Sequence, residues 1–394
     1  MSTSLYEATT PELVSPGAAT ALLDAYRPAT DRFLASPRHT LLGHGTAAGI
    51  SRPAQVRDAL AALRRPDAAT PLVMGCLPFA PDAPAALAVP ETVRWAPPLR
   101  EDPLVALPVP HSGPTRHDWR VREVPAPAEY GAAVAAAVAR MRAGDFDKVV
   151  LARTLELTCP TEPDLPAMLR RLARRDRAGY TFALPSGPGR TLVGASPELL
   201  VARHGGRLTA NPLAGSAPRS ADLAEDVRRA VALLESEKDL HEHAVVVAAV
   251  REALAPYCDR LAVPERPTLV RTAALWHLST TVTGDLADPE VTALDLASAL
   301  HPTPAVCGTP TEVAREVIAA SEPFDRGPYT GMVGWQDADG DGEWVVTIRC
   351  AEAEGRSLRL FAGAGVVAAS SPEAETAETA AKFRTFLHAV GAEL

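Results

Sequence analysis

The sequence lacks the features that place a protein in a membrane or on a nucleic acid. No uncharged apolar stretch approaches the roughly 18 residues that a transmembrane helix requires. Basic residues do not dominate, since 39 Lys and Arg stand against 48 Asp and Glu and leave a net charge of -9. Because a nucleic-acid surface needs clustered Lys and Arg, neither a membrane nor a nucleic acid is expected as a partner.

Cysteine is also sparse, and its spacing disfavours a disulfide framework or a zinc site. The cysteines number five, an odd count, and none of them forms a C-x-x-C pair. We expect reduced and mostly buried thiols at the five positions, which are Cys76, Cys159, Cys258, Cys307 and Cys350. The first residues show neither the basic nor the apolar region of a secretory signal, so a cytoplasmic protein is expected.

The residues that are present have an ordinary globular composition, with 47% hydrophobic and 22% charged side chains. Apolar residues at helical spacing predict a helix over 128–143, which ends near Gly144. The run Val149 to Ala152 is apolar on both faces and predicts a strand inside a sheet. No repeat or charged linker follows residue 128, so we expect one large α+β unit.

Further patterns predict strands interrupted by a few helices. Segment 222–254 is expected to be helical with a break near Glu235 and Ser236, and another helix follows Pro372. The later strands are expected at Trp276–Thr283, Tyr329–Gln336, Glu343–Cys350 and Ser357–Ala362. This assignment places Arg349 inside an apolar strand, where an arginine commonly awaits a carboxylate.

A glycine motif near the C-terminus invites a nucleotide-binding interpretation. Gly363-Ala-Gly365-Val-Val-Ala368 matches the pattern G-x-G-x-x-[GA]. A dinucleotide fold, however, continues with a long series of strands and helices, for which the tail to Leu394 is too short. The glycines instead predict a close approach of backbone to ligand, and the helix that follows favours an anion.

Two motifs resemble metal-binding sites, but the spacing of their residues argues against metal binding. His241-Glu242-His243 places its histidines two residues apart, on nearly opposite helix faces, unlike the zinc motif H-E-x-x-H. Asp337-Ala-Asp-Gly-Asp-Gly342 begins like a calcium loop, but Ile348 stands where the last ligand, Glu, is required. A hairpin tip is the better interpretation of this second motif.

Two acidic pairs on separate helices are more informative. Asp239 and Glu242 are i, i+3 neighbours, and Glu375, Glu378 and Lys382 share one face of the last helix. Either pair alone is usually solvated. Together they form a candidate Mg²⁺ site, because Mg²⁺ takes few carboxylates and completes its shell with water and substrate oxygens.

An opposed acid and base are expected at Lys148 and Glu198. Lys148 heads the apolar strand, where burial makes the neutral amine of a general base more accessible. Glu198 follows Ser196-Pro197 between two apolar strands, and burial there would raise its pKa as a proton donor needs. Such a pair suits general acid–base catalysis.

These residues lie in a series of motifs that resembles a known family. The motifs are Phe146-Asp-Lys-Val-Val-Leu-Ala-Arg153, Gly194-Ala-Ser-Pro-Glu198, Asn211-Pro-Leu-Ala-Gly-Ser216, Ser236-Glu-Lys-Asp-Leu-His-Glu-His243, Leu275-Trp-His277, His301-Pro-Thr-Pro-Ala305, Gly334-Trp335, Thr347-Ile-Arg349 and Gly363-Ala-Gly365. In this order they resemble the chorismate-utilising enzymes of the anthranilate synthase component I type, and most closely the isochorismate synthases. The resemblance covers about residues 120–390.

The resemblance implies an α+β fold with two curved β-sheets packed together and flanked by helices. Residues 1–119 would form a variable part packed on a chorismate-binding core at 120–394. Mg²⁺ would be the cofactor and chorismate the substrate. No glutaminase subunit is expected, and relatives without one are often monomers.

By the same resemblance, Lys148 corresponds to the base that activates water for attack at C2, and Glu198 to the acid that protonates the departing C4 hydroxyl. Glu242 and Glu378 correspond to direct Mg²⁺ ligands, with Asp239 and Glu375 as neighbours that act through water. The implied substrate-binding residues are Leu213, Gly215, Ser216, His277, Ala305, Tyr329, Arg349, Gly363, Gly365 and Lys382.

Isochorismate is the expected product, with two alternatives. Salicylate synthases, which also eliminate pyruvate, resemble this chain but commonly carry Thr at the position of Ala305. Amino-transferring relatives such as anthranilate synthases usually lack a lysine at the position of Lys148. Because the acid, base and metal positions are all filled, an enzyme is favoured over a non-catalytic chorismate-binding module.

Overall fold

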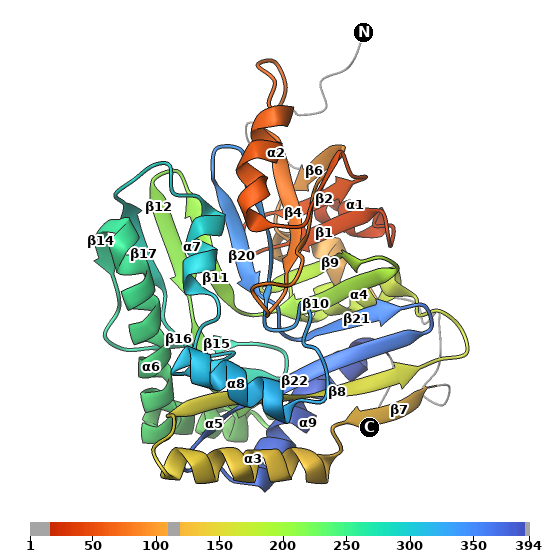
Figure 1. Cartoon of the computed structure of the whole chain (residues 1–394). Coiled ribbons are helices and arrows are strands. Elements are labelled where there is room, and N and C mark those ends of the chain that lie inside the picture. Colours follow the sequence, from red (N-terminus) through yellow and green to blue (C-terminus); the bar gives the residue numbers. More distant parts are fainter. Residues whose placement is uncertain (1–15, 109–118, 391–394) are drawn as a thin grey trace.

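A computed structural model describes residues 16–108 and 119–390, in which two large antiparallel sheets and a small one carry the fold (Figure 1). The first sheet runs in the order β18 (Gly308–Thr309), β8 (Lys148–Thr158), β22 (Ser357–Val367), β21 (Cys350–Glu354), β10 (Arg190–Ser196), β9 (Tyr180–Gly187), β1 (Asp31–Ala35), β2 (Thr40–His44) and β6 (Thr92–Ala96), with β7 (Arg120–Val124) also beside β8. The second runs in the order β14 (Cys258–Ala262), β17 (Val282–Leu286), β12 (Arg207–Asn211), β11 (Leu199–His204), β20 (Gly342–Val346), β19 (Met332–Asp337), β4 (Leu72–Leu77), β5 (Ala86–Val89) and β3 (Ala48–Ile50). The small sheet holds β13 (Leu213–Pro218), β16 (Leu275–Ser279) and β15 (Thr268–Arg271).

The two large sheets pack on each other through a shared apolar cluster. Phe182 and Leu192 of the first sheet belong to the same buried cluster as Met74, Val333 and Val345 of the second. Strands buried on both faces read as continuous apolar runs, which is why their sequences show little alternation. The predicted architecture of two packed sheets flanked by helices is confirmed.

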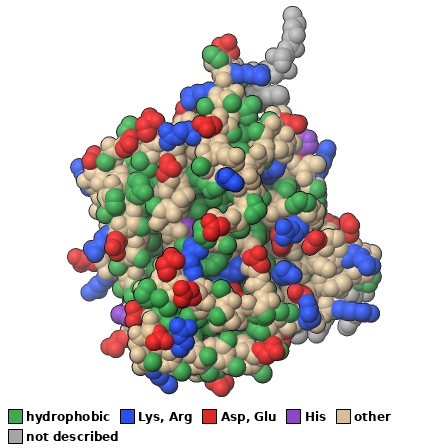
Figure 2. Space-filling model, in the orientation of Figure 1, with side chains coloured by type: hydrophobic (Ala, Val, Ile, Leu, Met, Phe, Trp, Pro, Cys, Tyr) green, Lys and Arg blue, Asp and Glu red, His purple; other side chains and the backbone are tan. Residues whose placement is uncertain are grey.

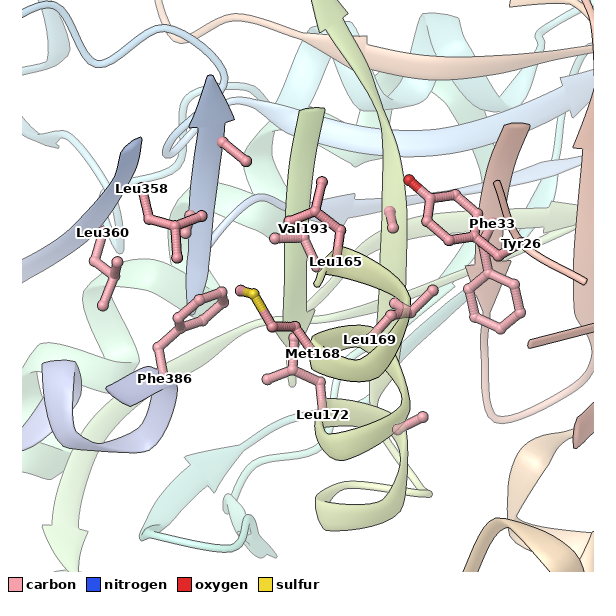
Figure 3. Packing of buried hydrophobic residues seen from close by; sticks show 14 of the residues in the cluster. Tyr26, Phe33, Leu165, Met168, Leu169, Leu172, Val193, Leu358, Leu360 and Phe386 are labelled. Carbon is pink, nitrogen blue, oxygen red and sulfur yellow. The ribbon is translucent and has the colours of Figure 1, made fainter. Parts of the chain in front are cut away.

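Helices cover the outer faces of both sheets. Figure 3 shows Met168 of α4 (Leu165–Arg175) among Val193, Leu358 and Phe386, the last from α9 (Pro372–Val390). The same face carries α1 (Ala18–Asp24). The outer face of the second sheet is covered by α2 (Val56–Leu63), α6 (Glu237–Leu254) and α7 (Ala293–Leu300), while α3 (Pro127–Arg142) and α8 (Thr311–Ser321) pack on β8.

Several local predictions are confirmed. The helix expected over 128–143 is α3, and the buried strand at Val149 is part of β8. The break expected near Ser236 separates α5 (Leu223–Glu235) from α6. Ser236 caps α6, since its hydroxyl accepts a hydrogen bond of 3.2 Å from the Asp239 N–H.

Two strand predictions are wrong because the chain changes sheets where the apolar pattern continues. The segment Trp276–Thr283 forms β16 in the small sheet and then β17 in the second sheet. Likewise, β20 ends at Val346 and β21 of the first sheet begins at Cys350. A hydrophobic pattern records burial but not the partner strand, so neither crossing is visible in it.

The N-terminal residues contribute strands to both large sheets. Strand β1 pairs with β9 in the first sheet, and β4 pairs with β19 in the second. The division at residues 119 and 120 stays a prediction, and residues 1–15 and 109–118 of the N-terminal part lie outside the described residues.

The distribution of charge on the surface and the hydropathy of the described helices agree with the sequence. Acidic and basic side chains are interspersed over the face drawn in Figure 2. Within residues 16–108 and 119–390, none of the helices combines the length and the apolar character needed to cross a membrane.

Candidate active site

One cavity brings together almost all of the predicted site residues. It lies where β8 and β22 of the first sheet meet the small sheet and the helices α6 and α9. The predicted residues that line it are Glu198, Leu213, Gly215, Ser216, Asp239, Glu242, His277, Ala305, Tyr329, Arg349, Gly363, Gly365, Glu378 and Lys382. The remaining two do not line its wall: Lys148 is bonded to the lining residue Glu242, and Glu375 lies one helical turn before the lining residue Glu378.

Lys148 reaches the cavity through an ion pair. It is the first residue of β8 and is only 3% exposed. Its Nζ atom donates a hydrogen bond of 2.7 Å to Oε1 of Glu242, which α6 presents from the opposite side. This carboxylate compensates for the loss of water around the buried ammonium group.

Glu198 occupies the turn between β10 and β11 and is 3% exposed. Burial raises the pKa of its carboxyl group to about 7. A hydrogen bond from the Leu213 N–H and the charges of Arg349 and Lys148 oppose this rise only in part. A carboxyl group with this pKa is substantially protonated near neutral pH, as a general acid must be.

The acidic side chains come from two helices on either side of the cavity. Glu242 and Asp239 project from α6, and Glu378 projects from α9 with Glu375 one turn before it. Glu378 accepts a hydrogen bond of 2.5 Å from Lys382, and Asp239 accepts one of 2.5 Å from the Ser236 hydroxyl.

The two glutamates of α9 differ in pKa. Burial raises the pKa of Glu375, and the neighbouring charge of Glu378 adds to the rise. Burial also acts on Glu378, but the charges of Lys382, Lys238 and Arg349 outweigh it and lower the pKa. Of these two carboxyl groups, the ionised form is therefore favoured in Glu378 and disfavoured in Glu375.

This donor set fits Mg²⁺ in its chemistry, although it does not enclose a metal by itself. Within the described residues, no three His, Cys, Asp or Glu side chains are close enough to hold a metal ion. Asp239, Glu242 and Glu378 nevertheless line one cavity and offer the oxygen ligands that Mg²⁺ prefers. A cation there would need substrate oxygens or water to complete its shell.

Positive and neutral groups face the acidic side. Arg349 was expected inside a strand, but it lies between β20 and β21 with a φ of 52°, so this prediction is wrong. The left-handed conformation occurs where the chain crosses between the two large sheets. The Arg349 carbonyl accepts a hydrogen bond of 3.1 Å from the Ala195 N–H, and the Arg349 side chain lines the cavity.

His277 presents an unused hydrogen-bonding atom to the site. Its Nε2 atom is buried and has no hydrogen-bond partner among residues 16–108 and 119–390. Burial, together with the charges of Arg349 and Lys382, lowers the pKa of His277 well below its ordinary value. The imidazole is therefore neutral at physiological pH, and a buried polar atom of this kind gains a partner when a polar ligand binds.

The two glycines belong to strand β22 rather than to a loop. They pair with Ala152 and Val150 of β8. A Cβ atom at Gly363 would lie 2.8 Å from the Tyr329 hydroxyl, and one at Gly365 would lie 2.9 Å from Oε1 of Glu242. Only glycine leaves these two functional groups in place. The close approach that the structure shows is to side chains of the site, and the approach to a ligand stays a prediction.

Comparison with known proteins identifies the family. The family described as chorismate binding enzyme matches residues 106–391. The chain belongs to the chorismate-binding enzymes. It is similar to the isochorismate synthase DhbC of Bacillus subtilis, with 50% identity over 94% of this chain and 96% of the relative. It is also similar to the vibriobactin-specific isochorismate synthase of Vibrio cholerae, with 42% identity over 95% of this chain and 94% of the relative.

A solved structure supports the same assignment of this chorismate-binding enzyme. A protein of Bacillus anthracis, assigned as the 2,3-dihydroxybenzoate-specific isochorismate synthase DhbC, matches with a TM-score of 0.88 and 46% identity. The match covers 95% of this chain and 99% of the other. The predicted family and α+β fold are therefore confirmed.

Several residues that line the cavity of this chorismate-binding enzyme were not predicted from the sequence, and Lys238 is the charged one among them. Lys238 precedes Asp239 in the first turn of α6, one turn before Glu242. A signal was available, because the chain has only three lysines, Lys148, Lys238 and Lys382, and all three lie at this site. The other missed lining residues are Val150, Pro197, Ala214, Val306, Thr330 and Ile348.

Proposed function

We propose that this chorismate-binding enzyme is an isochorismate synthase, which converts chorismate to isochorismate with Mg²⁺ as cofactor. The observation that carries the proposal is the convergence of a buried lysine, Lys148, and a buried glutamate, Glu198, on one cavity. The names of relatives similar over nearly the whole chain support the same activity.

The reaction needs one group that removes a proton from the attacking water and another that donates a proton to the leaving hydroxyl. Lys148 in its neutral amine form acts as the general base, accepting a proton from the water that attacks C2 of the substrate ring and becoming an ammonium group. Glu198 acts as the general acid, donating a proton to the C4 hydroxyl, which leaves as water. One water is added and one is lost, so the reaction is an isomerisation, and each group typically contributes about 10²–10⁴ in rate.

The substrate is a dianion, and the cationic groups at the cavity suit its two carboxylates. Arg349 and Tyr329 would hold the enolpyruvyl carboxylate, since a guanidinium and a phenol both donate hydrogen bonds. Lys382, beside Gly363 and Gly365, would hold the ring carboxylate. His277 and Ala305 would contact the ring, and Leu213, Gly215 and Ser216 would close the remaining wall.

Glu242 and Glu378 would bind Mg²⁺ directly, with Asp239 and Glu375 acting through water. Bound there, the cation would offset the repulsion between protein and substrate carboxylates. Lys148 and Lys382 hold the two ligand side chains at 2.7 and 2.5 Å.

The decisive test is to incubate the protein with chorismate and Mg²⁺ and to separate the products by chromatography. Isochorismate without salicylate or pyruvate is the expected result. Salicylate together with pyruvate would instead assign a salicylate synthase, and no turnover of chorismate would refute both activities.

We further propose a cytoplasmic monomer that works without a glutaminase subunit. The predicted acid, base and metal-binding residues all occur in this chain, at or beside one cavity, so the proposed site needs no residue from a second copy. Size-exclusion chromatography with light scattering tests the oligomeric state. Glutamine or ammonium should not change the product, and an aminated product would contradict the proposal.

A further inference from the structure

The edge of strand β8 that faces away from β22 has a gap in its backbone pairing. On this edge β18 pairs with Lys148 and Val149, and β7 pairs with Thr154 and the residues after it. Among the described residues no strand pairs with 150–153 on this side. The backbone groups that no strand pairs with include the carbonyl of Val150 and the N–H of Ala152. They need other hydrogen-bond partners because the strand is buried.

Two side chains fill this gap in place of a strand. Oε1 of Glu322 accepts a hydrogen bond of 2.8 Å from the Ala152 N–H, and Nη2 of Arg326 donates one of 2.7 Å to the Val150 carbonyl. Glu322 and Arg326 also bind each other in a bidentate ion pair, at 2.8 and 2.5 Å. Both side chains are 3% exposed, so water does not compete for these bonds.

The same guanidinium reaches two other walls of the cavity. Its Nη1 atom donates to the Val306 carbonyl at 3.0 Å and to Oγ1 of Thr330 at 3.1 Å. Val306 follows Ala305, and Thr330 follows Tyr329 and has a φ of 58°. Phe79, from the N-terminal part of the chain, lies against the guanidinium with its ring centre 4.6 Å away.

Arg326 therefore bonds to three separate segments that line the cavity. These contain Val150, Val306 and Thr330, and they adjoin the proposed base, the ring-contacting Ala305 and the carboxylate-binding Tyr329. Arg326 itself does not line the cavity. A substrate bound in the cavity would therefore not touch Arg326, and any effect on the reaction must act through these neighbours.

We propose that Arg326, oriented by Glu322, is a positioning residue that fixes the distances between these three walls of the active site. The proposal rests on the function proposed above. Arginine suits this role because its planar group carries five N–H donors in fixed directions, whereas a lysine has three on a flexible stem. A lysine cannot make both bonds to Glu322 and also reach Val150, Val306 and Thr330.

The substitution Arg326→Lys tests this role, and Arg203→Lys is the matched control. Arg203 is also buried, at 5% exposure, and it donates hydrogen bonds to Asp341, Asp339 and Pro289 at the far end of β11. Both variants lose bonds of the same kind, but Arg203 bonds to none of the segments that line the cavity. Circular dichroism and thermal melting first establish a temperature at which both variants are fully folded.

At that temperature we expect Arg326→Lys to lower kcat for chorismate by about tenfold or more, because small misplacements of reacting groups are costly. We expect KM to change less than kcat, and Arg203→Lys to keep both constants within about twofold of wild type. Equal kinetic losses in the two variants, or wild-type kinetics in Arg326→Lys, would overturn the proposal.

If Arg326→Lys does not fold, the isosteric variant Glu322→Gln decides the question. The glutamine retains an oxygen that can accept the hydrogen bond from the Ala152 N–H, but it weakens the bidentate ion pair with the Arg326 guanidinium. A fall in kcat of several-fold with normal secondary structure supports the proposal, and unchanged kinetics refutes it. Failure of the proposed function is seen separately, because the wild-type protein would then form no isochorismate.

Discussion

The Nζ atom of Lys148 lies 2.7 Å from Oε1 of Glu242, so the proposed base and a proposed metal ligand form one ion pair across the cavity. The two residues come from β8 and α6, which belong to different layers of the fold. Changing either residue therefore alters the electrostatic surroundings of the other.

Lys148→Ala should reduce turnover of chorismate by about 10²–10⁴, because it removes the base that activates water. Chorismate should still bind, which calorimetry at saturating Mg²⁺ can measure. Arg122→Ala is the control, since its exposed side chain pairs with Glu156 toward the other end of β8. Turnover in Lys148→Ala close to that of the control would contradict the role of Lys148.

Glu198→Gln should reduce kcat by a similar factor of about 10²–10⁴, because glutamine keeps the shape of the side chain but cannot protonate the leaving hydroxyl. Glu352→Gln is a suitable control, as Glu352 is also buried and bonds to Ser186 away from the cavity. Rapid-quench measurement of a single turnover separates chemistry from product release. A normal single-turnover rate in Glu198→Gln would rule out the proposed acid.

The same variant should become more stable than wild type as pH rises. Burial raises the pKa of Glu198 from its ordinary value of 4.5 to about 7, so the folded state favours the neutral acid. The free energy of unfolding of the wild type falls as pH rises from about 4.5 to 7. Over this range the Glu198 carboxyl is ionised in the unfolded chain but still largely neutral in the folded protein. Glutamine does not ionise and avoids the loss, which amounts to at most about 3 kcal/mol.

Urea unfolding of wild type and Glu198→Gln at pH 5 and pH 8 measures this effect. The free energies of unfolding should be close at pH 5, and the variant should be the more stable protein at pH 8. A difference that does not depend on pH would show that Glu198 is already ionised in the folded protein at pH 5.

Removal of Mg²⁺ with EDTA should stop the reaction, and added Mg²⁺ should restore it. Glu378→Gln should raise the Mg²⁺ concentration needed for half-maximal rate by about tenfold or more, since it removes a charged ligand. Glu373→Gln, an exposed position in the first turn of the same helix, is the control. Full activity after exhaustive chelation would eliminate the metal site.

Gly365→Ala should lower kcat/KM by about 10²-fold, because the new Cβ atom would lie 2.9 Å from Oε1 of Glu242 and 3.2 Å from Cε of Lys148. Gly206→Ala is the control, as its Cβ atom would meet no atom within 4 Å. Steady-state kinetics on both variants provides the measurement. Equal activity would mean that the ion pair can shift without cost.

The parts of the fold and the site that depend on local chemistry could be predicted from the sequence. The break at Ser236 follows from a capping residue, and the burial of Lys148 follows from the apolar run behind it. Arg349 could not be placed in the same way, because its conformation is set where the chain passes from one sheet to the other. Pattern alone gives no sign of such a crossing.

The Glu322 and Arg326 pair was invisible for a related reason. Its role depends on a gap between β18 and β7 along β8, and β18 comes from a part of the chain far from the other two strands. An i, i+4 pair of Glu and Arg in sequence is ordinarily a solvated surface pair. Only the three-dimensional arrangement shows that this pair is buried and bonded to the backbone.

The scarcity of lysine allows the active site of this protein to be labelled selectively at its amines. Because Lys148, Lys238 and Lys382 are the only lysines and all lie at the cavity, reagents that acylate amines can modify side chains at one place alone, apart from the N-terminal amine. Intact mass measured with and without chorismate would then count protected amines directly. Occupancy of the active site thus becomes readable by mass spectrometry without a mutation or an attached dye.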